Sequence, residues 1–176
     1  ILTKESLCDV PSVGLYDVST SDIVLNGAPF ECLTFSSYRK VGCGDLYITL
    51  RDKSDPDAPL TKPKAFLHQE DVSFHNHPDS PHFEWGLEGA KIDQLRPDLF
   101  LTTGVCFLEK SHEHIGTRQR VFMAASRSID EKPLAFATPF EPTQYEHGQG
   151  ENGHPETVDL GDRLGIIFQE RAGEFR

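Results

Sequence analysis

The stretch DLYITLR at residues 45–51 decides the fold class, because Leu46, Ile48 and Leu50 alternate strictly with Tyr47 and Thr49. Side chains two residues apart project from the same face of a β-strand, so this alternation predicts a strand with one face in a hydrophobic core. Weaker alternation predicts further strands at residues 22–25, 31–36, 72–77, 105–109, 119–124 and 164–170.

Turn-forming residues separate these runs at short intervals. They lie at Asn26-Gly27 and Gly161-Asp162 and at residues 42–44, 55–59 and 78–81. Such spacing predicts an all-β fold with little helix, a jelly-roll-like sandwich or barrel. Helix signals are scarce, and the best of them is at residues 89–95, where Pro97 would end a helix after barely two turns. Residues 142–155 contain three glycines and two histidines without periodicity, which predicts a long surface loop before the final strand.

Length and charge limit the classes of function. A chain of 176 residues fits a single domain, residues 1–176, and can enclose a hydrophobic core without metal or disulfides. The formal net charge is −11, which repels phosphate backbones, so we expect no nucleic-acid binding. We expect no membrane insertion either, because apolar runs are short and 26% of the residues are charged.

The start of the chain and the cysteines bear on the cellular compartment. The sequence begins at Ile1, as expected if a leader had been removed or the chain trimmed. Cys8, Cys32, Cys43 and Cys106 have no C-x-x-C spacing. Cys32 and Cys43 flank a predicted turn and would form a disulfide in an exported protein. The alternative is that the cysteines are free, buried thiols that pack as small apolar residues.

Histidines cluster in one part of the chain, at His68, His75, His77 and His82. On a strand, His75 and His77 would project from one face, and a turn at residues 78–81 could return His82 and Glu84 to the same side. Imidazole and carboxylate groups are ligands for Fe, Mn, Ni, Cu and Zn. We therefore predict a divalent transition metal bound by His75, His77 and His82, with Glu84 or His112 completing its ligands.

The same residues resemble the first motif of the cupin superfamily, a His-x-His followed by Glu and then Gly. Here the motif reads His75-Asn76-His77, then His82 where the family usually has Glu, then Gly89. Residues 97–104 are similar to the second motif but lack its Gly and Pro, and its expected histidine has no counterpart at the right distance. The resemblance covers about residues 65–114. It implies a small jelly-roll barrel with a central metal and an oxygenase, isomerase or lyase type of activity.

Two functions remain open from the sequence. The first is a metal-dependent, cupin-like enzyme acting on a small molecule, in which Glu84, if not a ligand, is the catalytic general base. The second is a noncatalytic β-sandwich module, exported or on a particle surface, that binds a protein or glycan through its loops. The cysteines and the absent initiator methionine favour an exported location, and the oligomeric state stays open.

Overall fold

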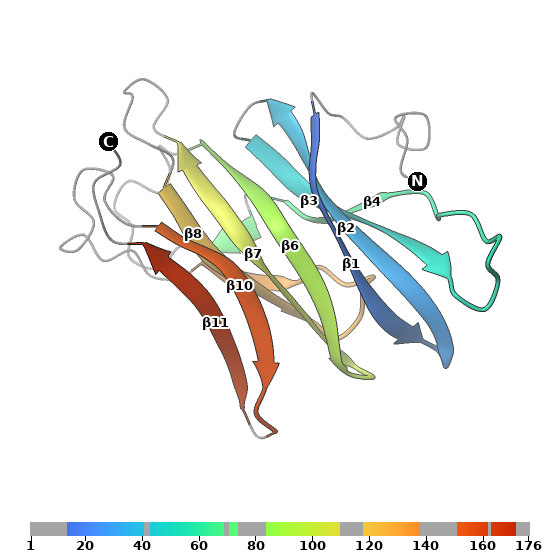
Figure 1. The fold of residues 1–176 in the computed structure, drawn as a ribbon. Helices are drawn as coiled ribbons and strands as arrows, with labels where there is room; N and C mark the ends of the chain where they lie inside the picture. The colour runs from blue at the N-terminus through green and yellow to red at the C-terminus, as the bar shows by residue number, and fades with distance from the viewer. Residues whose placement is uncertain are drawn as a thin grey trace.

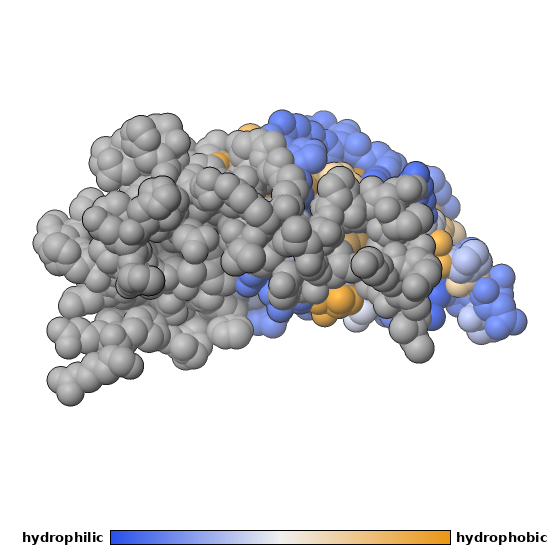
Figure 2. Space-filling model, turned by 90° about the horizontal axis from the view of Figure 1, so that it is seen from above, coloured by the Kyte–Doolittle hydropathy of each residue, from blue (hydrophilic) through white to orange (hydrophobic). Residues whose placement is uncertain are grey.

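The computed structural model describes residues 14–40, 43–68, 71–73, 84–109, 118–137, 151–161 and 163–171. These residues form eleven β-strands and no helix, which confirms the predicted all-β sandwich with little helix (Figure 1). None of them forms a helix with the length and apolar character that a membrane span requires. On the face seen in Figure 2, the described surface is mainly hydrophilic and its apolar residues form small, separate patches.

The first half of the chain forms a meander of three long strands. β1 (Gly14–Leu25) pairs with β2 (Ala28–Lys40), which pairs with β3 (Cys43–Asp52), and the short β4 (Lys64–Leu67) adds to β3. The turn between β1 and β2 consists of Asn26 and Gly27, with φ angles of 52° and 83°. Positive φ at both positions matches the twist of a two-residue hairpin, which explains why Asn-Gly stands here.

The second half forms another meander. It contains β6 (Glu84–Arg96), β7 (Leu99–Glu109), β8 (Arg118–Ser126) and β9 (Leu134–Ala137), and the short β5 (Val72–Ser73) runs parallel to β9 at its edge. Among the described residues, one parallel register pair, Gly44 with Gly86, joins β3 to β6 and makes one nine-stranded sheet. The sheet folds back on itself, so that β1 and β2 pack against β6.

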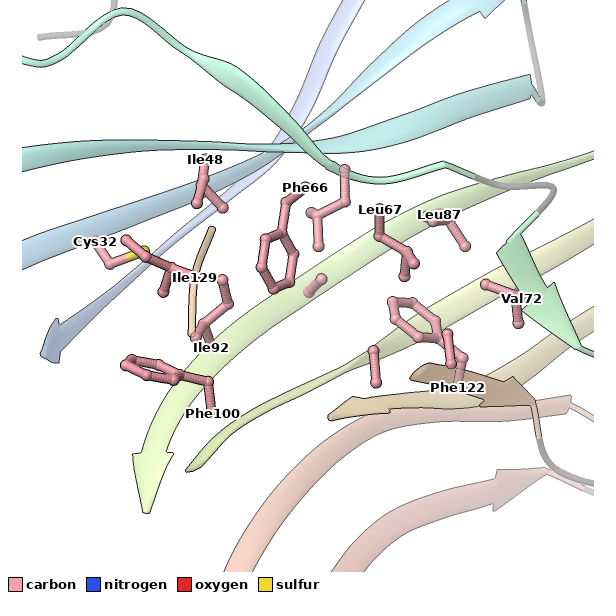
Figure 3. Close-up of a cluster of buried hydrophobic side chains, with 14 of the residues drawn as sticks. Cys32, Ile48, Phe66, Leu67, Val72, Leu87, Ile92, Phe100, Phe122 and Ile129 are labelled. Carbon is pink, nitrogen blue, oxygen red and sulfur yellow. The ribbon is translucent and has the colours of Figure 1, made fainter. Parts of the chain in front are cut away.

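The core lies between the two meanders (Figure 3). Leu46 and Ile48 of β3 are fully buried in it, which confirms that residues 45–51 form a strand with one face in a core. Leu67 of β4 and Val72 of β5 are buried in the same core, so both short strands contribute to it. The remaining cluster members come from both meanders and from the loop after β8: Ile23, Cys32, Phe66, Leu87, Ala90, Ile92, Phe100, Phe122, Ala124, Ile129 and Ala135.

A hairpin of β10 (Glu151–Asp159) and β11 (Leu164–Arg171) forms a third layer. β10 packs against β7 and β8, beside which it lies in Figure 1. Leu101, Val105 and Val121 are also buried. Along β7 and β8 they alternate with the core residues Phe100 and Phe122, so they point to the opposite face of the sheet. The strands β7 and β8 are thus covered on both faces.

Two predictions about secondary structure are wrong. Residues 89–95 belong to β6 and not to a helix. A β-bulge shifts the register between Glu88 and Lys91, so that Leu87 and Ala90, three residues apart, are both buried in the core. Buried apolar residues three positions apart are also typical of a helix, so the bulge produces a helix-like pattern in the sequence. In the predicted loop at residues 142–155, the part from Glu151 onward belongs to β10, and residues 142–150 lie outside the described residues.

Candidate functional site

The predicted metal ligands His75, His77, His82 and His112 lie outside the described residues. Glu84 is the first residue of β6 and lies opposite Glu109 of β7, and its backbone alone is described. Within the described ranges, no group of three or more His, Cys, Asp and Glu side chains could hold a metal. The metal site therefore stays a prediction.

The topology places the ends of this histidine-rich segment in the fold. β5 ends at Ser73 and β6 begins at Glu84, so both ends of residues 74–83 are fixed by strands. The start of β6 lies beside the start of β3, because Gly86 pairs with Gly44. The end of β4 lies there too, because Leu67 pairs with Leu46. Asp45 and His68 are the next residues along these two strands, which brings them to the same end of the sheet as Glu84.

Asp45 and His68 form a polar pair at this end. Leu46 and Leu67 point into the core, so their neighbours Asp45 and His68 project from the opposite face of the sheet. Nδ1 of His68 lies 3.3 Å from Oδ2 of Asp45. The Asp45 side chain is only 5% exposed, whereas the His68 side chain is 48% exposed. The pair thus has one buried member and one that solvent or a ligand can reach.

The burial of Asp45 gives the pair its chemical character. A carboxylate removed from water needs a partner, and the His68 ring supplies one. Because Nδ1 faces a hydrogen-bond acceptor, the favoured neutral tautomer carries its proton on Nδ1 and keeps the lone pair of Nε2. An imidazole oriented in this way presents Nε2, which is a nitrogen that can bind a metal.

The surroundings of Asp45 are well packed on this outer face. Ser37 of β2, the register partner of Asp45, is fully buried. Phe35 stacks on Tyr47, with ring centroids 5.8 Å apart and the planes inclined by 17°. Phe35 is also fully buried although it does not belong to the core between the meanders. These contacts pack the outer face of the strand that carries Asp45.

The sequence reasoning missed this pair. His68 belongs to the histidine cluster but has no predicted role there, and the alternation indicates Asp45 only as the first residue of a strand. The sequence does contain one signal for this pair. The alternation in residues 45–51 puts the Asp45 side chain on the strand face opposite Leu46. Its partner depends on the pairing of β3 with β4, which no local pattern specifies.

The predicted disulfide between Cys32 and Cys43 is wrong, because Cys32 is a free, buried thiol. The two residues lie on neighbouring strands, but Cys32 pairs with Leu50 and Cys43 pairs with Lys40. Seven residues of strand between Cys43 and Leu50 span about 23 Å, far beyond the reach of a disulfide. With Cys32 unpaired, the other three cysteines can form at most one disulfide.

Burial also determines the reactivity of Cys32. Removal from water raises the pKa of its thiol to about 12, and the positive charge of Lys64 opposes this only in part. The thiolate is the reactive form, so Cys32 acts as a core residue and not as a nucleophile.

Comparisons of the whole chain with protein-family models, with curated proteins and with solved structures found no match.

Proposed function

We propose that this protein binds a divalent transition metal, one of Fe, Mn, Ni, Cu or Zn, through the histidine-rich segment at residues 68–84. His75, His77 and His82 are the proposed ligands, as the resemblance to cupins implies, and Glu84 or His112 completes the set. The observation that supports a metal site at this end of the sheet is the pair of Asp45 and His68.

The pair has the features of a metal-binding histidine with its supporting carboxylate. Imidazole ligands usually direct their other ring nitrogen to a carboxylate or carbonyl, which fixes the ring and strengthens it as a donor. Asp45 takes this supporting position toward His68, with 3.3 Å between Oδ2 and Nδ1. His68 is therefore an additional candidate ligand through Nε2, and its ring is half exposed.

The proposed activity follows the cupin resemblance and concerns a small-molecule substrate. A bound metal would polarise a substrate oxygen or activate water there. Glu84, at the beginning of β6 and near the same end of the sheet, is the proposed general base if it is not a ligand. An oxygenase, isomerase or lyase reaction fits this assignment.

Metal uptake tests the proposal. Chelator-treated protein should take up close to one Mn, Fe, Ni, Cu or Zn ion per chain, measured by calorimetry and by elemental analysis. His75→Ala combined with His77→Ala should abolish uptake, and His68→Ala should weaken it. His154→Ala, in the β10–β11 hairpin, is the matched control and should bind like the wild type. Absence of stoichiometric uptake for every metal would exclude the function.

A noncatalytic module that binds a protein or glycan is the second candidate. Its support is the β10–β11 hairpin, where Leu160 and Ile167 are 60% and 65% exposed. Apolar side chains on an exposed hairpin are suited to contact a partner surface. A metal-free protein that loses partner binding when both residues become serine would favour this function over the enzymatic one.

A further inference from the structure

A short turn joins β4 to β5 and begins with His68. His68 follows Leu67, the last residue of β4, and Asp71 precedes Val72, the first residue of β5. Leu67 and Val72 are both buried in the core, so the turn is anchored at each end (Figure 3). The Asp71 N–H donates to the His68 carbonyl oxygen at 3.0 Å and closes the turn. The position of His68 therefore depends on that of Asp71.

The side chain of Asp71 is paired with a lysine from a distant part of the chain. Nζ of Lys132 lies 2.6 Å from Oδ1 of Asp71. The Asp71 side chain is 13% exposed, whereas the Lys132 side chain is 71% exposed. A carboxylate that is mostly removed from water needs a partner, and Lys132 supplies one. Without this partner, the carboxylate would gain free energy by turning toward water, and the turn that carries it would shift.

The loop between β8 and β9, which carries Lys132, has contacts of its own with the rest of the fold. Ile129 is buried in the core (Figure 3). The Asp130 N–H donates to Oγ of Ser128 at 3.1 Å. Lys64 of β4 forms an ion pair with the Asp130 side chain. These contacts tie the loop to the core and to β4, the strand that leads into the turn.

We propose that Asp71 and Lys132 are positioning residues for the metal site, because they hold the turn that sets His68 against Asp45. Lys132 pairs with the Asp71 carboxylate, and the Asp71 N–H binds the His68 carbonyl oxygen. Nδ1 of His68 in turn lies 3.3 Å from Oδ2 of Asp45. The inference rests on the proposed function as far as the metal is concerned, whereas the orientation of His68 is measurable without metal.

The tautomer of the His68 ring reports its contact with Asp45. A neutral ring that donates from Nδ1 to the carboxylate keeps its proton there, whereas a ring released from Asp45 populates both tautomers. Nitrogen NMR of the metal-free protein, at a pH where the ring is neutral, distinguishes the two forms. The wild type should show the Nδ1–H tautomer, and Lys132→Met should show a mixture.

Two further variants separate positioning from a general loss of charge. Lys132→Arg keeps the cation and should restore the wild-type spectrum. Lys53→Met is the matched control, because Nζ of Lys53 also lies 2.6 Å from a carboxylate oxygen, that of Asp22. Lys53 follows the last residue of β3, at the end of this strand opposite Asp45. Its replacement should leave the His68 spectrum unchanged.

Metal titration measures the consequence for binding. Lys132→Met should bind metal roughly fivefold more weakly than the wild type, the upper end of what an ion pair with an exposed partner contributes. Lys132→Arg and Lys53→Met should bind like the wild type. A changed tautomer in Lys132→Met with unchanged metal affinity would remove both residues from the metal site.

The two measurements fail in different ways. A wild type that takes up no metal would exclude the proposed function, and the tautomer would still decide whether Asp71 and Lys132 position His68. Identical tautomer populations in Lys132→Met and the wild type would overturn the positioning role, whatever the metal titration shows.

Discussion

Nδ1 of His68 lies 3.3 Å from the buried Oδ2 of Asp45. The contact joins β3 to the residue that follows β4, and the pairing of these two strands is not local in the sequence. The contact offsets the cost of burying the carboxylate. It also positions the ring for the proposed metal site.

Asp45→Asn should lower the free energy of unfolding by about 1–3 kcal/mol, because a charged partner in a buried contact is lost while the side-chain shape is kept. Metal affinity should fall roughly 10-fold to 100-fold, as for other supporting carboxylates. Chemical denaturation and metal titration measure the two effects. Asp57→Asn, at an exposed position, is the control. Equal metal affinity in Asp45→Asn and wild type would remove Asp45 from the site.

The Glu88 carboxyl should make stability depend on pH. Its pKa is raised from 4.5 to about 7 in the folded protein, so between these values the folded state binds more protons than the unfolded state. Its stabilising contribution is therefore complete below pH 4.5, falls as the pH rises, and is lost above pH 7. Since Glu88 is only half buried, we expect about 1–2 kcal/mol.

The measurement compares wild type with Glu88→Gln by thermal unfolding at pH 5 and pH 8. The Tm of Glu88→Gln, relative to that of the wild type, should be a few degrees higher at pH 8 than at pH 5. Parallel pH profiles for the two proteins would contradict the assignment.

Gly104→Ala should destabilise the fold by about 1–3 kcal/mol through overpacking. A Cβ at this position would lie 2.8 Å from Cε1 of Phe122 and 2.9 Å from both Cβ of Ala90 and the carbonyl oxygen of Glu88. Gly165→Ala is the matched control, because its nearest contact is an ordinary 3.5 Å. In denaturant unfolding, Gly104→Ala should be less stable than Gly165→Ala. Equal stability would show that the β6 bulge can shift.

Cys32 should resist alkylation in the folded protein. Its thiol is buried and its pKa is raised to about 12, so little thiolate forms at pH 8 and the reagent cannot reach it. Peptide mass spectrometry after iodoacetamide should find Cys32 unmodified under native conditions and modified in denaturant. Rapid native labelling, or a disulfide that includes Cys32, would contradict the structure.

The fold was predictable wherever the signal was local. The alternation at residues 45–51 indicates β3, and Asn26-Gly27 indicates the hairpin before β2, because each depends on neighbouring residues alone. The strand β6 was missed because its bulge at Gly89 changes the phase of the alternation. The start of β10 was missed because its residues are mostly polar.

The contacts of the candidate site could not be predicted for a different reason. Asp45 meets His68 only because Leu46 pairs with Leu67, far along the chain. Periodicity identifies single strands and their apolar faces, but it does not specify which strands become neighbours. The predicted ligands His75, His77, His82 and His112 remain predictions.

The β10–β11 hairpin follows both meanders in the sequence, and β10 packs on the outer faces of β7 and β8. During synthesis, both meanders can assemble before this hairpin emerges, and until then Leu101, Val105 and Val121 face water. A nascent chain ending near Ala137 would therefore expose these apolar side chains, which favours chaperone binding or self-association. Packing of β10 on β7 and β8 then covers these side chains.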